Sequence, residues 1–296
     1  MKTSTFLLAA TITLSCTCCT QKATETESNT SENLSSKILV NGTEISYQLV
    51  GEGDYTLVFA HGWCINQSYW IDQVNAFKSN YQVLTLDLPG FGESGKNRPD
   101  WSIESYGNDL NEVINQLKLA NVILIGHSMS GDIVLEAALN DPKIVAVIGV
   151  DTFKDVGTEL TEEVQAEIEG FMGMLKENFA EVASAYAMQA MFHPSTDSLV
   201  IQQVIKDFST SEPSIAVNSL ENLFEYAAVE SAKLSKLQQK LILINSDATP
   251  THFPGLDASG VNYQVIDIPS TGHYPMVEKP GLFNEKLTEA LAQIKK

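Results

Sequence analysis

One serine lies in a sequence context that could make it a nucleophile. Ser128 belongs to the stretch Asn121-Val-Ile-Leu-Ile-Gly-His-Ser-Met-Ser-Gly131, which indicates a strand buried on both faces, a sharp turn and the start of a helix. The small residues Gly126 and Ser130 allow the strand and the helix to approach closely on either side of the turn. The Ser128 hydroxyl would then be exposed at the carboxyl end of the strand, above a helix N-terminus that favours negative charge.

This stretch resembles the nucleophile elbow of the α/β-hydrolase fold family, whose usual pattern is Gly-x-Ser-x-Gly. Ser130 occupies the last position of that pattern, and Gly131 follows directly. Because serine is small, we expect the turn to survive this departure. The resemblance implies that Ser128 attacks a carbonyl carbon and forms an acyl-enzyme, which water then releases.

A second stretch, His61-Gly62-Trp63, follows an apolar strand pattern at residues 55–60. It resembles the oxyanion-hole loop of the same family. The resemblance implies that the backbone N–H groups of Trp63 and Met129 point at the developing oxyanion. Removing one such donor typically costs ~3–4 kcal/mol of transition-state stabilisation.

The expected general base lies near the C-terminus. The stretch Thr271-Gly-His273-Tyr-Pro-Met-Val-Glu278 follows the last apolar strand pattern and resembles the closing motif of the family. In that motif the histidine takes the proton of the serine and later delivers it to the leaving group. His273 is therefore the expected base.

Two carboxylates compete for the role of the acid that orients His273. The order Ser…Asp/Glu…His requires a carboxylate after a strand, between Ser128 and His273. Asp247 follows the apolar run 241–245, and Asp151 follows the apolar run 144–150. Some members of the family draw the acid from the earlier position, but we favour Asp247 and keep Asp151 as the alternative.

The elements that must position these residues alternate between apolar strand patterns and helical patterns. Such alternation predicts a mostly parallel central sheet with helices on both faces, which is the α/β-hydrolase fold. Strand patterns stop between Asp151 and Lys240, where residues 158–190 and 197–235 have a helical period. We therefore expect one hydrolase domain over residues 37–296, with an inserted helical cap at about 152–238.

The N-terminus has the features of an export signal. Residues 1–19 combine one positive charge with a short apolar run, which is typical of a secretory signal peptide. Leu14-Ser15-Cys16 resembles a bacterial lipoprotein processing site, and Cys19 is the alternative lipidation site. Residues 20–36 are rich in polar side chains and should form a disordered tether. We expect an exported protein, periplasmic or on the cell surface, that is anchored to a membrane.

Charge and motifs narrow the range of partners. The formal net charge of −19 argues against binding nucleic acid, or an anionic membrane surface through the domain. The sequence contains no metal-ligand cluster, no P-loop and no dinucleotide-binding fingerprint, so neither a metal nor a cofactor is expected. The expected partner is a small ester-like molecule, and contact with a membrane is expected only through the N-terminal anchor.

The resemblance implies a reaction class and leaves alternatives within it. A serine at the elbow disfavours the dehalogenases and epoxide hydrolases of this fold, which use aspartate there. We favour hydrolysis of a small or medium-sized, fairly apolar carboxylic ester. A cofactor-free perhydrolase or haloperoxidase, and a carbon–carbon bond hydrolase, would use the same three residues. A non-catalytic, ligand-binding lipoprotein on a hydrolase scaffold is the alternative from a different class.

Overall fold

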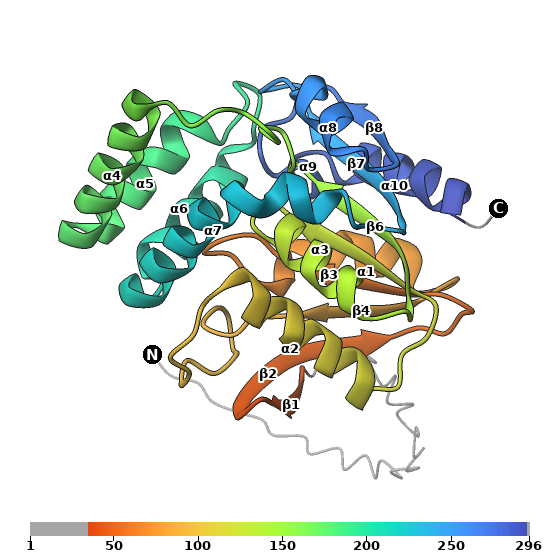
Figure 1. Ribbon diagram of the computed structural model, residues 1–296. Coiled ribbons are helices and arrows are strands. Elements are labelled where there is room, and N and C mark those ends of the chain that lie inside the picture. The colour runs from red at the N-terminus through yellow and green to blue at the C-terminus, as the bar shows by residue number, and fades with distance from the viewer. Residues whose placement is uncertain (1–34, 295–296) are drawn as a thin grey trace, which may run out of the picture. The chain divides into compact units, whose positions relative to one another are not determined.

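The computed structural model describes residues 35–294 (Figure 1). The predicted signal peptide, the candidate lipidation site Cys16 and the predicted tether up to residue 34 lie outside this range. The first strand already begins at Ser36, one residue before the expected start of the domain. Within the described residues, no helix is long and apolar enough to cross a membrane.

The described chain forms an eight-stranded sheet in the order β1-β2-β4-β3-β5-β6-β7-β8. Strand β2 pairs antiparallel with β1 and β4, and every other pairing is parallel. The sheet therefore matches the mostly parallel arrangement that the sequence predicts. The strands are β1 (Ser36–Val40), β2 (Thr43–Val50), β3 (Thr56–Ala60), β4 (Gln82–Leu86), β5 (Val122–His127), β6 (Ile144–Val150), β7 (Lys240–Ser246) and β8 (Tyr263–Ile268).

Strand β5 lies between β3 and β6 and is buried along its whole length. Its register pairs Gly126 with Ala60 of β3 and His127 with Val150 of β6. Because these neighbouring strands are parallel, the loops that follow them leave the sheet at the same edge. The sequence motifs at residues 61–63, 126–131 and 151 are thereby brought together at one edge of the sheet.

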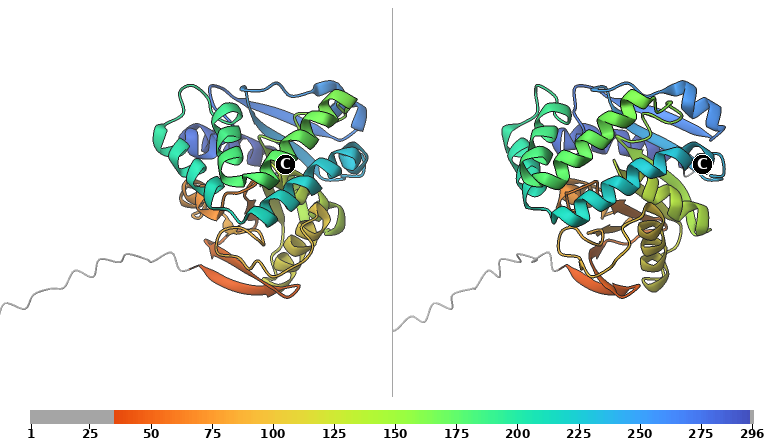
Figure 2. Two further views of the ribbon diagram at one scale, coloured as in Figure 1. Left: turned by 90° about the vertical axis from the view of Figure 1, so that its left-hand side faces the viewer. Right: turned by 60° about the vertical axis from the view of Figure 1, so that its left-hand side comes forward.

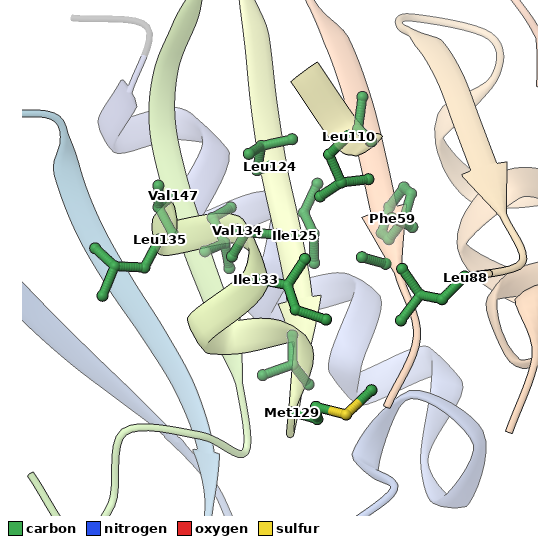
Figure 3. Close-up of a cluster of buried hydrophobic side chains, with 14 of the residues drawn as sticks. Phe59, Leu88, Leu110, Leu124, Ile125, Met129, Ile133, Val134, Leu135 and Val147 are labelled. Carbon is green, nitrogen blue, oxygen red and sulfur yellow. The ribbon is translucent and has the colours of Figure 1, made fainter. Parts of the chain in front are cut away.

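Helices cover both faces of the sheet, with α2 and α3 on one face and α1 and α10 on the other (Figure 1). Helix α3 begins directly after the elbow and packs apolar side chains such as Ile133 and Val134 over Leu124 and Ile125 of β5 (Figure 3). This packing holds the elbow between a buried strand and a buried helix. The core helices are the short 3-10 helix η1 (Gln67–Trp70), α1 (Ile71–Phe77), α2 (Ile103–Gln116), α3 (Ser130–Asn140), α8 (Phe253–Ser259), α9 (Pro275–Glu278) and α10 (Pro280–Ile294).

The helical insert between β6 and β7 is present and consists of four helices within the described chain (Figures 1 and 2). They are α4 (Glu162–Glu177), α5 (Phe179–Ala190), α6 (Ser198–Thr210) and α7 (Pro213–Leu234). The two long helical patterns of the sequence are thus each divided in two. Asn178, with φ −145° and ψ 71°, leaves the helical conformation between α4 and α5. Pro213 can start α7 but cannot continue α6, because it lacks the N–H that a helix interior requires.

Candidate active site

Ser128 is held in a strained turn between β5 and α3. Its φ of 53° lies in the left-handed region, which costs a residue with a Cβ atom about 1–3 kcal/mol. Three hydrogen bonds to neighbouring residues maintain this conformation. The Ser128 N–H donates to the Val150 carbonyl at 3.0 Å, and the Ser128 carbonyl accepts from the Gly131 N–H at 2.8 Å and from the Thr152 hydroxyl at 3.0 Å. The turn thus keeps Ser128 half-buried at the end of the central strand.

The spacing of small residues around the turn has a direct steric reason. A Cβ atom on Gly126 would collide with the Ser130 carbonyl oxygen, and one on Gly131 would collide with the Thr152 side chain. Ser130 itself tolerates a side chain because its hydroxyl has a partner. The Ser130 Oγ donates to the His61 carbonyl oxygen at 2.5 Å, and both residues are fully buried. The departure from the usual elbow pattern therefore connects the elbow to the loop after β3.

His273 lies in the loop between β8 and α9, and its partner is Asp151. The His273 Nδ1 lies 2.6 Å from Asp151 Oδ2, with the two side chains 20% and 5% exposed. Asp151 comes directly after β6, the strand beside the elbow strand. Since Asp151 occupies Nδ1, Nε2 is the ring nitrogen that remains to face a reacting group.

The prediction that Asp247 pairs with His273 is therefore wrong in its geometry. Asp247 is exposed, and its Oδ1 accepts from the Ser270 N–H at 2.8 Å. It follows β7, which lies one strand further from the elbow than β6. The alternative named from the sequence, Asp151, occupies the position beside His273.

The environment of Asp151 favours its charged form. Burial alone would raise the pKa of this carboxyl. The hydrogen bond and charge of His273 and the ammonium of Lys154 lower the pKa by more than burial raises it. The resulting pKa lies well below the usual range of an aspartate. Asp151 Oδ1 also accepts from the Ser246 N–H at 2.8 Å and lies 2.6 Å from Lys154 Nζ. A carboxylate with these three contacts stays ionised and fixed in orientation.

His127 makes a hydrogen bond to the backbone of His273. Its Nε2 lies 2.7 Å from the His273 carbonyl oxygen, so this nitrogen carries the proton. Complete burial lowers the pKa of His127 to about 3, which keeps the ring neutral. The His127 ring is thus engaged with the His273 backbone and contributes to its positioning.

Glu278 fixes both sides of the His273 loop. Its Oε2 accepts from the Gly272 N–H at 2.9 Å, and its Oε1 accepts from the Tyr274 N–H at 3.0 Å. The same carboxylate accepts from the Thr196 hydroxyl at 2.6 Å, which connects this loop to the segment between α5 and α6. The loop that carries His273 is therefore tied to the cap.

The two residues expected to donate to an oxyanion lie at the ends of paired strands. Trp63 follows β3, and Met129 precedes the first residue of α3. The Trp63 indole N–H donates to the Ala216 carbonyl of α7 at 2.8 Å, and its ring meets Phe179 and Phe208 edge-on. The side chain of Trp63 thus anchors the cap while its backbone lies beside the elbow.

The remaining histidines have other contacts. His61 is buried, its Nε2 accepts from the Leu88 N–H at 2.9 Å, and its Nδ1 donates to the Gly62 carbonyl at 2.8 Å. His61 therefore holds the loop after β3 in place. His193 contacts Ser195 in the cap, and His252 lies near the Val156 carbonyl. In the part of the chain that the structure describes, no group of three His, Cys, Asp or Glu side chains could hold a metal ion.

Known proteins share this architecture. Residues 55–251 match the α/β hydrolase fold family. The pimeloyl-[acyl-carrier protein] methyl ester esterase of Yersinia enterocolitica is 24% identical over 261 residues, covering 84% of this chain and 98% of its own. Other curated relatives are matched over 31% to 85% of their own length.

Solved structures give the same result. An esterase from Exiguobacterium antarcticum superposes with a TM-score of 0.77 at 21% identity, covering 89% of this chain and all of its own. A bromoperoxidase from Bacillus anthracis superposes with a TM-score of 0.74 at 21% identity, covering 87% of this chain and all of its own. At such identities the likeness concerns the fold.

Replacing Ser130 by Ala should lower the free energy of unfolding by about 1–3 kcal/mol, because the buried His61 carbonyl loses its donor. Urea denaturation followed by fluorescence measures this difference. Ser214→Ala serves as the control, since Ser214 is an exposed serine in the first turn of α7. Equal stability of the two variants would contradict the importance of the Ser130 hydrogen bond.

Proposed function

The chain belongs to the α/β-hydrolase fold family, and from this premise we propose that it hydrolyses small or medium-sized, apolar carboxylic esters with Ser128 as the nucleophile. The observation that carries the proposal is the 2.6 Å contact between His273 Nδ1 and Asp151 Oδ2. It orients a histidine in the loop after β8, and the strained elbow presents a serine at the same edge of the sheet. Nucleophile, base and orienting acid are the constellation that acyl transfer requires.

The reaction begins when the Ser128 Oγ attacks the ester carbonyl carbon. His273 Nε2 takes the hydroxyl proton, and the ionised Asp151 stabilises the imidazolium. The negative charge that develops on the carbonyl oxygen is stabilised by the backbone N–H groups of Trp63 and Met129. When the tetrahedral intermediate collapses, the carbon–oxygen bond breaks and His273 gives its proton to the departing alcohol.

Water completes the cycle by the reverse use of the same groups. His273 takes a proton from the water as its oxygen attacks the acyl carbon. The second tetrahedral intermediate releases the carboxylic acid, and the proton returns to the Ser128 oxygen. Each step needs only the three side chains and two backbone donors, so no metal or cofactor enters the proposed chemistry.

The preference for an apolar substrate rests on the character of the cap. Trp63 meets Phe179 of α5 and Phe208 of α6 edge-on, so aromatic rings lie between the oxyanion loop and the insert. Pockets for small molecules are mostly apolar, with a few polar groups that fix orientation. The three rings are buried in the contact between the loop and the insert, and from this apolar packing we infer an aliphatic or aromatic acyl chain.

Asp151→Asn should reduce kcat by about 10⁴-fold, because an amide cannot stabilise the imidazolium or hold the required tautomer. Hydrolysis of p-nitrophenyl esters of increasing chain length provides the measurement. Asp247→Asn is the matched control and should keep nearly full turnover, since Asp247 contacts only the Ser270 backbone in the described structure. The opposite ranking of the two variants would restore Asp247 as the acid.

A fluorophosphonate should label the folded protein once, on Ser128, because phosphonylation needs an activated serine and not a particular substrate. Intact mass and peptide mapping identify the adduct. His273→Ala should abolish labelling while leaving the thermal unfolding transition in place. A folded wild-type protein that takes up no label would favour the alternative of a ligand-binding protein on a hydrolase scaffold.

We also propose that the protein is exported and lipid-anchored through Cys16. The support is the sequence of residues 1–19 and the polar stretch that follows it. In a bacterial host, Cys16→Ser should move the protein from the membrane fraction to the soluble fraction, and Cys19→Ser should not. Unchanged membrane association of the Cys16 variant would speak against this anchor.

A further inference from the structure

A buried lysine lies against the carboxylate that orients His273. Lys154 follows β6 in the loop before the cap and is only 9% exposed. Its ammonium lies 2.6 Å from Asp151 Oδ1. It also donates to the Ser246 carbonyl and hydroxyl at 3.1 and 3.0 Å and to the Thr249 hydroxyl at 3.0 Å. Lysine is almost never buried to this extent unless it is paired, so this placement is specific.

The lysine divides the two oxygens of Asp151 between different partners. Oδ1 receives the Lys154 ammonium and the Ser246 N–H, and Oδ2 receives His273. The last residue of β7, Ser246, and Thr249 of the loop that follows thereby hold Asp151 and Lys154 in place. The contacts at Oδ1 prevent rotation of the carboxylate and hold Oδ2 toward the histidine.

The charge of the lysine acts on the same pair. Proton uptake by His273 adds positive charge near an ammonium that is shielded from water, where charges interact more strongly than in solvent. Two other titratable groups pack against the His273 ring, namely His127 and Tyr274, with ring centroids at 4.7 and 5.3 Å. Burial lowers the pKa of His127 and raises that of Tyr274, so both stay neutral. The Glu278 carboxylate, which accepts from the N–H groups of Gly272 and Tyr274, adds negative charge near His273. In the described surroundings of the pair, Lys154 supplies the positive charge that opposes proton uptake.

We propose that Lys154 is a positioning residue that extends the working range of His273 as a base toward acidic pH. Its ammonium offsets part of the attraction between Asp151 and a protonated imidazole, so that the ring stays neutral, and able to accept the serine proton, at lower pH. The catalytic part of this inference rests on the proposed function. The effect on the ring titration rests only on the contacts of Lys154 and Asp151.

Lys154→Met removes the charge and keeps a side chain of similar length. Whichever of His273 and Asp151 holds the proton, uptake becomes easier when a nearby positive charge is removed. We expect the midpoint of the His273 ring titration, followed by NMR on the purified full chain, to rise by about one pH unit. The acidic limb of the pH profile of kcat/KM should move in the same direction by a similar amount.

Two further variants separate charge from packing. Thr249→Val removes one neutral partner of the same ammonium and leaves its charge, so the titration midpoint and the acidic limb should stay at their wild-type positions. Lys154→Gln loses the charge but keeps a donor for Ser246 and Thr249, and should shift the midpoint as Lys154→Met does. Lys154→Gln also tests the proposal if the methionine variant does not fold.

The outcomes distinguish this inference from the proposed function. The wild type could lack esterase activity while the Lys154 variants still shift the His273 ring titration. That result would support the electrostatic role of Lys154 and contradict the proposed ester hydrolysis. An active enzyme in which folded Lys154→Met and Lys154→Gln leave both the titration and the acidic limb unmoved would overturn the inference. Lys154 would then act only in stabilising the loop, which thermal unfolding of the same variants measures.

Discussion

The hydrogen bond between His273 and Asp151 depends on the order of strands in the sheet. Asp151 can reach His273 because β6 lies directly beside β5, while the β8 loop folds back over the same edge. A buried carboxylate is stable there only with its partners present, and Lys154 and the Ser246 N–H complete the set. The parallel pairing of β5, β6 and β7 is what brings these residues, distant in sequence, to one point.

The elbow imposes a second constraint, which is steric. Ser128 adopts a left-handed conformation because β5 must turn directly into α3. The Ser130 carbonyl oxygen then leaves no room for a Cβ atom at position 126, which is why this residue is glycine. The His61 carbonyl lies beyond the end of the β3–β5 ladder, since the last pair in register is Ala60 with Gly126. The Ser130 hydroxyl supplies the donor that the ladder no longer provides, so a side chain joins the elbow to the loop after β3.

Much of the fold and part of the site could be predicted from the sequence. The buried strand before Ser128 and the apolar run before Asp151 identified the central strands, because strands covered on both faces are continuously apolar. The acid could not be assigned, because chain order allows a carboxylate after either β6 or β7 and only the folded loops decide. The roles of Lys154 and Ser130 could not be predicted either. Lys154 contacts Asp151 and Ser130 contacts the His61 carbonyl only because of the order of the strands and the conformation of the loops. The break at Asn178 depends on backbone angles that periodicity does not record, whereas Pro213 marks the break between α6 and α7 in the sequence itself.

Trp63 joins the loop after β3 to the helical insert. Its indole donates to the Ala216 carbonyl in the first turn of α7 and packs against Phe179 and Phe208. Its backbone follows β3, which pairs with the elbow strand β5. At the other side of the site, Glu278 joins the His273 loop to Thr196 of the insert. Displacement of the insert would therefore act on both the loop after β3 and the loop that carries His273. The helical insert is thus fastened to both sides of the candidate site as well as covering it.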